Sequence, residues 1–230
     1  MIARFYFSLR SPYSWLAYRD LLTHHPDVAD ILEWRPFWEP DDGFLEMLTE
    51  AGGRFPYVDM SRAKALYILQ DVRRLANQRG LKVAWPVDRK PRWEVSHLAY
   101  LVAQRHGKGP EFIAGVYRAR WEQARDISDP ETIAAIGSEL DLDPVELVTA
   151  EKHPEIRDAA LRALQAVDAD GVFGVPFFVV GREKFWGVDR LPDVVAAVRA
   201  RQSAPEPVPE SAVAEPVAAA GDLGHAGGCG

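Results

Sequence analysis

Apolar and polar positions divide the chain into a strand-rich start, a long helical middle and a strand-rich end. Residues 2–7 (IARFYF) are short and aromatic-rich, which predicts a buried strand. Residues 31–38 (ILEWRPFW) predict a second strand, and Pro36 indicates an edge strand or a bulge because proline lacks a ladder donor. Between them, Ser11 is a typical N-cap and Pro12 a typical first helical residue, so a helix follows directly.

The middle of the chain repeats the apolar spacing of one helix face. Ser61 is the expected cap of a helix that ends at Gly80. Asp129-Pro130 and Asp143-Pro144 each place a capping carboxylate before a proline, which predicts two more helix starts. Further helices are expected around residues 97–104, 111–124 and 154–167.

The end of the chain returns to mixed structure. PFFVV (176–180) predicts a buried strand, GRE (181–183) a hairpin turn and KFW (184–186) a short partner strand. A last helix has Leu191, Val194, Val195 and Val198 on one face. The order β-α-β, helices, β-β-α predicts an α/β thioredoxin-like fold with a large all-helical insertion and a mixed sheet that contains a right-handed β-α-β unit.

This order also suggests how the chain is divided. We expect a thioredoxin-like domain at 1–55 and 168–200, a helical insertion domain at 56–167, and a disordered tail at 201–230. From residue 202 onward the chain is rich in Ala, Pro, Glu and Gly and has no aromatic residue, so it cannot bury enough apolar surface to fold. His225 and Cys229 in this tail are alternatives for a metal ligand or an intermolecular disulfide, but an exposed tail without such a role is favoured.

Composition narrows the class of function. The chain has 230 residues, 47% of them hydrophobic, a net charge of −7 and a pI near 5.4. It can bury a sizeable core, and it lacks the basic stripe of a nucleic-acid-binding protein. No apolar run has membrane-spanning length and no basic leader precedes the first strand, so a cytoplasmic protein acting away from membranes is expected.

Metal and disulfide chemistry have little support in the sequence. The only cysteine is Cys229, so neither an internal disulfide nor dithiol chemistry within one chain is possible. The six histidines have no metal-ligand spacing, and no metal site is expected. Most of the seven tryptophans are expected in the core, with Trp38, Trp85 and Trp93 as alternatives for an aromatic pocket wall.

Two stretches suggest a binding site. In RSPYSW, Ser11 lies at a helix N-terminus, which favours an anion; its hydroxyl is placed to donate to a thiolate, or it is only an N-cap. In GVFGVPFFVV, a proline entering a buried strand is unusual. A cis Val175–Pro176 bond would turn the Val175 amide and carbonyl outward to pair with an extended peptide; a trans proline at the start of an edge strand is the alternative.

A third stretch, FWGVDR, precedes the last helix. Asp189 either caps that helix or binds an ammonium group, with the helix N-terminus holding a carboxylate. The capping interpretation is favoured for this stretch taken alone.

Taken together, three stretches resemble a known family. FYFSLRSPYSWLA near the start, KALYILQDVRRLA from Lys64 and GVFGVPFFVVGREKFWGVDRL near the end resemble the glutathione-dependent branch of the DsbA-like thioredoxin proteins, namely the 2-hydroxychromene-2-carboxylate isomerases and kappa-class glutathione transferases. In thioredoxin-like proteins the turn before the first helix usually carries a cysteine pair, and here Ser11 and Ser14 hold the two places.

The resemblance implies a role for particular residues. Ser11 would hydrogen-bond the glutathione sulfur, and Lys64 would face the active site. The Val175 backbone, before cis Pro176, would pair with the cysteinyl part of glutathione. Asp189, next to Val188, would bind the γ-glutamyl end. The resemblance also implies a homodimer.

The chain departs from the family pattern in two loops and at one site residue. EAGGRFPYVDM (50–60) lacks the asparagine of the family loop, and FWEPDDGF (37–44) adds Trp38, Glu39 and two aspartates to a segment that is usually small and Gly-rich. Val188 replaces a small polar residue. Both loops fall where the second substrate would sit, so its identity stays open.

These observations predict a glutathione- or related thiol-dependent isomerase of an unsaturated aromatic-type substrate. A kappa-like transferase and a non-catalytic DsbA-like scaffold are the alternatives. A disulfide enzyme is disfavoured by the serines at positions 11 and 14.

Overall fold

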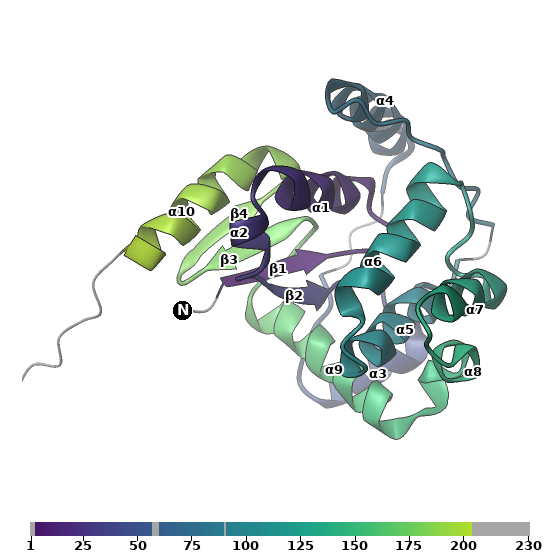
Figure 1. The fold of residues 1–230 in the computed structure, drawn as a ribbon. Coiled ribbons are helices and arrows are strands. Elements are labelled where there is room, and N and C mark those ends of the chain that lie inside the picture. Colours follow the sequence, from purple (N-terminus) through teal and green to yellow (C-terminus); the bar gives the residue numbers. More distant parts are fainter. Residues whose placement is uncertain (1–2, 57–59, 90, 204–230) are drawn as a thin grey trace, which may run out of the picture.

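A four-stranded mixed sheet forms the centre of one half of the molecule (Figure 1). The computed structural model describes residues 3–56, 60–89 and 91–203. The strands, β1 (Ala3–Phe7), β2 (Glu33–Pro36), β3 (Phe177–Val180) and β4 (Glu183–Trp186), lie in the order β2-β1-β3-β4. β1 pairs parallel with β2 and antiparallel with β3, and β3 pairs antiparallel with β4. The mixed sheet is therefore confirmed, and Pro36 ends an edge strand, where its missing N–H costs no ladder bond.

Helices connect β1 to β2, fill the chain between β2 and β3, and follow β4. Their bounds are α1 (Pro12–His24), α2 (Pro26–Ala29), α3 (Asp42–Glu50), α4 (Arg62–Gln78), α5 (Trp93–Arg105), α6 (Gly109–Tyr117), the π-helix η1 (Arg118–Glu122), α7 (Pro130–Glu139), α8 (Pro144–Val148), η2 (Ala150–Lys152), α9 (Pro154–Ala169), η3 (Val188–Arg190) and α10 (Leu191–Ser203). The predicted caps are present: the side chains of Ser11, Ser61, Asp129 and Asp143 each accept a backbone N–H in the first turn of their helix.

Each face of the sheet has its own apolar layer. Phe5 and Phe178 stack with ring centroids 4.6 Å apart in the main core, which includes buried residues of α1 and α10. On the opposite face Tyr6 and Phe177 pack with Val167 of α9. Figure 1 shows α1 and α10 on one side of the sheet and α9 on the other. The thioredoxin-like arrangement is therefore confirmed.

Several elements differ from the prediction. α3 was not predicted; it is capped by Asp41 and packs against α9. The helix expected over residues 111–124 is instead α6 followed by the π-helix η1. β2 is only four residues long, because Ile31 and Leu32 precede the strand and Phe37 and Trp38 follow it.

The division into domains stays a prediction. α10 continues to Ser203, past the expected start of the tail at residue 201. The rest of that tail, with His225 and Cys229, lies outside the described residues.

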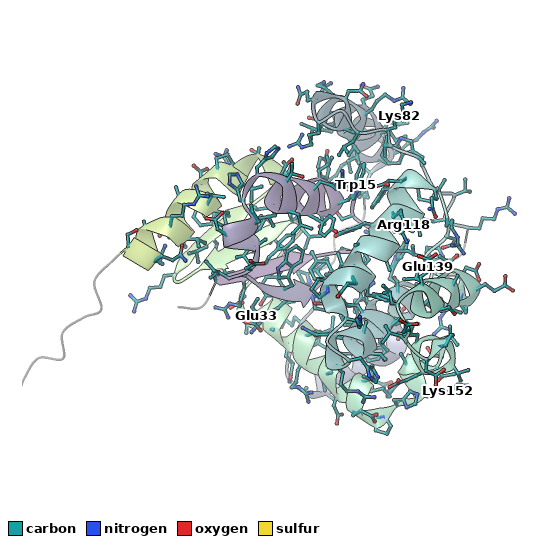
Figure 2. All side chains as sticks on the ribbon, viewed as in Figure 1. Trp15, Glu33, Lys82, Arg118, Glu139 and Lys152 are labelled. Atoms are coloured by element: carbon teal, nitrogen blue, oxygen red, sulfur yellow. The ribbon has the colours of Figure 1, made fainter. Side chains whose placement is uncertain are left out.

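The surface carries many charged side chains, whereas many of the large aromatic side chains lie inside; Tyr67, Phe173 and Trp186 are exposed exceptions. Figure 2 shows Glu33, Lys82, Arg118, Glu139 and Lys152 on the outside and Trp15 within. Trp15 is 1% exposed. Within residues 3–56, 60–89 and 91–203, no helix is both long and apolar enough to cross a membrane.

Candidate active site

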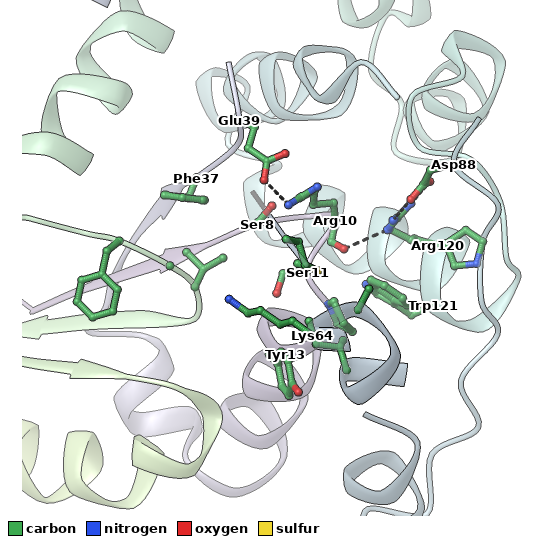
Figure 3. Close-up of a pocket in the computed structure, with 18 of the residues that line it drawn as sticks. Ser8, Arg10, Ser11, Tyr13, Phe37, Glu39, Lys64, Asp88, Arg120 and Trp121 are labelled. Carbon is green, nitrogen blue, oxygen red and sulfur yellow. Dashed lines mark hydrogen bonds and ion pairs between the residues drawn. The ribbon is translucent and has the colours of Figure 1, made fainter. Parts of the chain in front are cut away.

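A cavity of about 380 Å³ lies where the turn before α1 meets the helical middle of the chain (Figure 3). The turn that precedes α1, the first turns of α4, the loop that carries Trp85, the π-helix η1 and the segment before β3 all contribute to its walls. Of the residues that the sequence assigned to catalysis or cofactor binding, Ser11, Lys64 and Val175 line it together. Figure 3 shows Lys64 extending into the cavity on one side of Ser11, with Arg10 and Glu39 on the other.

The Ser11 hydroxyl caps α1 and can still donate a hydrogen bond. Its Oγ accepts the N–H of Ser14 at 3.2 Å, which caps α1. A hydroxyl that accepts one hydrogen bond still has its own O–H to donate. The first turn of α1 holds no acidic residue, so no side-chain charge offsets the positive end of the helix dipole there. The capping and anion-binding interpretations are therefore compatible.

The turn that carries Ser11 is held from below by a buried histidine. His97 Nε2 accepts the Leu9 N–H at 3.1 Å, and its Nδ1–H donates to the Trp93 carbonyl at 2.7 Å. Burial lowers the pKa of His97 to about 3, so the ring is neutral at pH 7. The Ser8 N–H donates to the Ser14 hydroxyl at 3.2 Å. The sequence carried no signal for this role of His97, because Leu9 lies 88 positions away along the chain.

The segment before β3 presents backbone to the cavity. The Val175–Pro176 peptide bond is cis. Neither the amide nor the carbonyl of Val175 makes a hydrogen bond to any residue in the described ranges. The Pro176 carbonyl accepts the Gly187 N–H at 3.0 Å, which ties this segment to the end of β4. An extended ligand can therefore pair with Val175.

The other predicted cofactor residues lie outside the cavity lining. Pro176, Val188 and Asp189 do not line it. Val188 is buried in the core, and the Asp189 side chain is 70% exposed and 3.6 Å from Arg190. The Asp189 carboxylate makes no hydrogen bond to a described residue, so the structure does not show the capping interaction favoured from the sequence. Its predicted role with a ligand stays a prediction.

Two guanidinium groups occupy the far end of the cavity. Arg10 pairs with Glu39, and Arg120 binds Asp88 with two hydrogen bonds of 2.9 and 2.7 Å. Burial raises the pKa of Glu39 above its usual range, and Arg10 opposes that rise. The sequence flagged Glu39 as an addition to its loop but gave no signal for Arg10 and Arg120. Arg120 points inward because it lies on the π-helix, a geometry that periodicity does not predict.

Aromatic rings complete the walls. Trp85 and Trp121 line the cavity edge-to-face, with centroids 5.7 Å apart. Trp38 is fully buried and Trp93 is 6% exposed, as expected for the core, whereas Trp85 belongs to the pocket wall. Within the described ranges, no group of three or more His, Cys, Asp or Glu side chains has the arrangement of a metal site.

The chain belongs to the DSBA-like thioredoxin domain family, whose pattern it matches over residues 3–199. A curated relative, the 2-hydroxychromene-2-carboxylate isomerase of Sphingobium xenophagum, is 28% identical over 196 residues, covering 81% of this chain and 92% of the relative. The family resemblance inferred from the sequence is therefore confirmed.

Solved structures agree on the fold. A 2-hydroxychromene-2-carboxylate isomerase superimposes with a TM-score of 0.68 at 23% identity, covering 88% of this chain and 96% of the other. The cytosolic disulfide reductase DsbM from Pseudomonas aeruginosa with GSH superimposes with a TM-score of 0.58 at 15% identity, covering 88% and 99%.

Proposed function

We propose that this protein is a thiol-dependent isomerase of an unsaturated aromatic-type substrate, with glutathione or a related low-molecular-weight thiol as its cofactor. One observation carries the proposal: Ser11, Lys64 and Val175, whose backbone pairs with no other described residue, line a single cavity. The isomerase relative supports the reaction type, and the DsbM structure that contains GSH supports the kind of cofactor.

The residues present fit a thiol of peptide character. The Val175 amide and carbonyl offer an antiparallel pairing edge for an extended backbone. The Ser11 O–H and the N-terminus of α1 suit a sulfur anion, because a thiol pKa falls at such a position. A bound thiol supplies a nucleophile that adds reversibly to an activated double bond, which then rotates as a single bond before the thiol leaves.

Each residue has one task in this scheme. The Ser11 hydroxyl donates to the sulfur and keeps it ionised. Lys64, whose side chain extends into the cavity beside Ser11 (Figure 3), stabilises the negative charge that develops on the substrate oxygen during addition. Trp85 provides a flat apolar surface against an aromatic ring, and Trp121 packs edge-to-face against it.

Disulfide exchange is not favoured despite the family. That chemistry needs sulfur at the turn before α1, and Ser11 and Ser14 occupy the places of the cysteine pair. The Ser14 hydroxyl is instead fully buried and accepts the Ser8 N–H, a structural role.

Calorimetric titration with glutathione and other cellular thiols tests the proposal. Wild type should show saturable binding, which Ser11→Ala weakens about tenfold or more, the effect of losing one hydrogen bond to a charged group. Asp189→Ala tests the predicted γ-glutamyl contact in the same titration. Ser138→Ala is the matched control, because Ser138 lies on the exposed face of α7, away from the cavity, and donates to the Ala134 carbonyl. If wild type binds none of these thiols, a thiol-dependent function is ruled out and a cofactor-free or scaffold role follows.

A further inference from the structure

The two guanidinium groups at the far end of the cavity differ in how firmly they are bound. The Arg120 side chain is 4% exposed, binds both oxygens of Asp88, and donates from Nε to the Arg10 carbonyl at 3.3 Å. Arg10 is 31% exposed, and its side chain contacts one carboxylate among the described residues, that of Glu39. Arg120 is therefore a fixed structural group, and Arg10 is the guanidinium placed to change partner.

The Arg10–Glu39 pair is poised for exchange. Glu39 lines the cavity and is 26% exposed, and its desolvation works against its charged form. When desolvation offsets much of the Coulomb attraction, an ion pair contributes little net stability. A second carboxylate that enters the cavity can therefore compete with Glu39 for Arg10, because the Glu39 side chain is exposed enough to turn to water when it leaves.

The guanidinium of Arg10 stacks on an aromatic side chain. The Arg10 and Arg120 guanidinium carbons each lie 5.2 Å from the centroid of the Trp93 ring. This stacking orients the Arg10 fork without using its hydrogen-bond donors.

Trp121 forms part of the same wall. It lines the cavity and is 2% exposed, and its indole N–H has no acceptor among the described residues. This nitrogen is itself buried, so Trp121 contributes to the rigidity of the wall beside Arg120 and offers no donor to a ligand.

We propose that Arg10 binds a carboxylate on the second substrate and that Glu39 is the internal counter-ion which this carboxylate displaces. The inference rests on the proposed function and deepens it by assigning recognition of the substrate carboxylate to Arg10, with Glu39 as its competitor. Lys64 keeps its separate task beside Ser11. Because the site is formed by Arg10, Glu39 and aromatic rings, it can be tested without any thiol present.

The test is calorimetric titration of the full chain with trans-cinnamate and with its neutral isostere trans-cinnamamide. Wild type should bind cinnamate about tenfold or more tightly than cinnamamide, the effect of one charge-assisted hydrogen-bonded pair. Arg10→Met should bring cinnamate down to the affinity of cinnamamide. Glu39→Gln should strengthen cinnamate binding about two- to fivefold, since it removes the competing carboxylate of a partly exposed pair. Because the two variants should change the affinity for cinnamate in opposite directions, either one tests the proposal if the other folds poorly.

Two controls separate this site from other charges. Arg201→Met removes a guanidinium from a surface pair with Glu183 and should leave both affinities unchanged. Lys64→Met should retain the preference for cinnamate. Equal binding of the two probes by wild type, no binding of either, or a preference that survives Arg10→Met overturns the proposal. The thiol titration is independent, so a failure here leaves the proposed cofactor site standing, and the reverse holds too.

Discussion

The hydroxyl of Tyr13 lies 2.8 Å from Asp71 Oδ2, and this hydrogen bond joins the first turn of α1 to the middle of α4. α1 presents Ser11 to the cavity and α4 presents Lys64, so the bond fixes one of these residues relative to the other. Desolvation by burial and the Asp71 carboxylate together raise the pKa of Tyr13, so the phenol stays protonated and donates.

Tyr13→Phe is expected to slow isomerisation without affecting thiol affinity. Loss of one hydrogen bond is worth about 1 kcal/mol, which corresponds to a rate about fivefold lower. Steady-state kinetics and thiol titration measure the two effects separately. Asp20→Asn is the matched control, because Asp20 binds Arg79 at the other end of α4. That variant should lower the free energy of unfolding but not the rate. Equal losses of rate and thiol affinity in Tyr13→Phe would assign Tyr13 to the thiol site instead.

Ser11 should govern the ionisation of the bound thiol. With Ser11 and the α1 N-terminus stabilising the anion, the pKa of the bound thiol is expected below that of the free thiol. Ser11→Ala should raise it by about one pH unit, equivalent to about 1.4 kcal/mol. Thiolate absorbance followed against pH in the saturated complex gives this value directly, and Ser138→Ala should match wild type. A bound thiol that titrates like the free thiol in wild type would contradict the role given to Ser11.

Local signals sufficed where one residue and its near neighbours decide the structure. Ser11, Ser61, Asp129 and Asp143 were predicted as caps, and each accepts the backbone N–H of the second or third residue of its helix. α3 was missed because only Phe44 and Leu48 of its residues are buried, which is too short a pattern to separate from a loop.

The charged end of the cavity was beyond sequence reasoning for a different reason. Arg10 and Glu39 are 29 positions apart, and Asp88 and Arg120 are 32 apart, so tertiary packing alone brings each pair together. The Ser11 turn was predictable because helix capping and the helix dipole are local properties. Ser11 and Lys64, by contrast, were assigned to one site through the family resemblance, and their shared cavity depends on how α4 packs against α1.

His97 should make the protein less stable in mild acid. Its pKa in the folded state, about 3, is far below the ordinary value of 6.5, so the unfolded state binds more protons between these values. Keeping His97 neutral therefore costs nothing above pH 6.5, and the free energy of unfolding falls as the pH drops from 6.5 toward 3. Between pH 6.5 and 4.5 the loss amounts to about 2 kcal/mol.

His97→Gln keeps an acceptor for the Leu9 N–H but cannot titrate. The variant should be less stable than wild type at pH 7, yet its free energy of unfolding should fall less on acidification. Urea denaturation of both proteins at pH 7, 5.5 and 4.5 isolates the histidine, because the carboxylates are common to both. Parallel pH curves for the two proteins would show that His97 is protonated in the folded state.

The Arg120–Asp88 pair should hold the loop that carries Trp85 against η1. Arg120 is almost fully buried but the Asp88 side chain is 27% exposed, so water partly solvates the carboxylate that Arg120→Met leaves behind, and the free energy of unfolding should fall by about 2 kcal/mol. Arg118→Met on the same helix removes an exposed partner of Glu139 and should cost less than about 0.5 kcal/mol. A double-mutant cycle with Asp88→Asn should give a coupling free energy of about 2 kcal/mol in urea denaturation. The Ala84 N–H donates to the Trp121 carbonyl at 2.8 Å, so loosening of the loop should also speed hydrogen exchange at Ala84. A coupling near zero with unchanged exchange at Ala84 would mean that the loop is held by Trp85 packing against Trp121, and that the Arg120–Asp88 ion pair is dispensable.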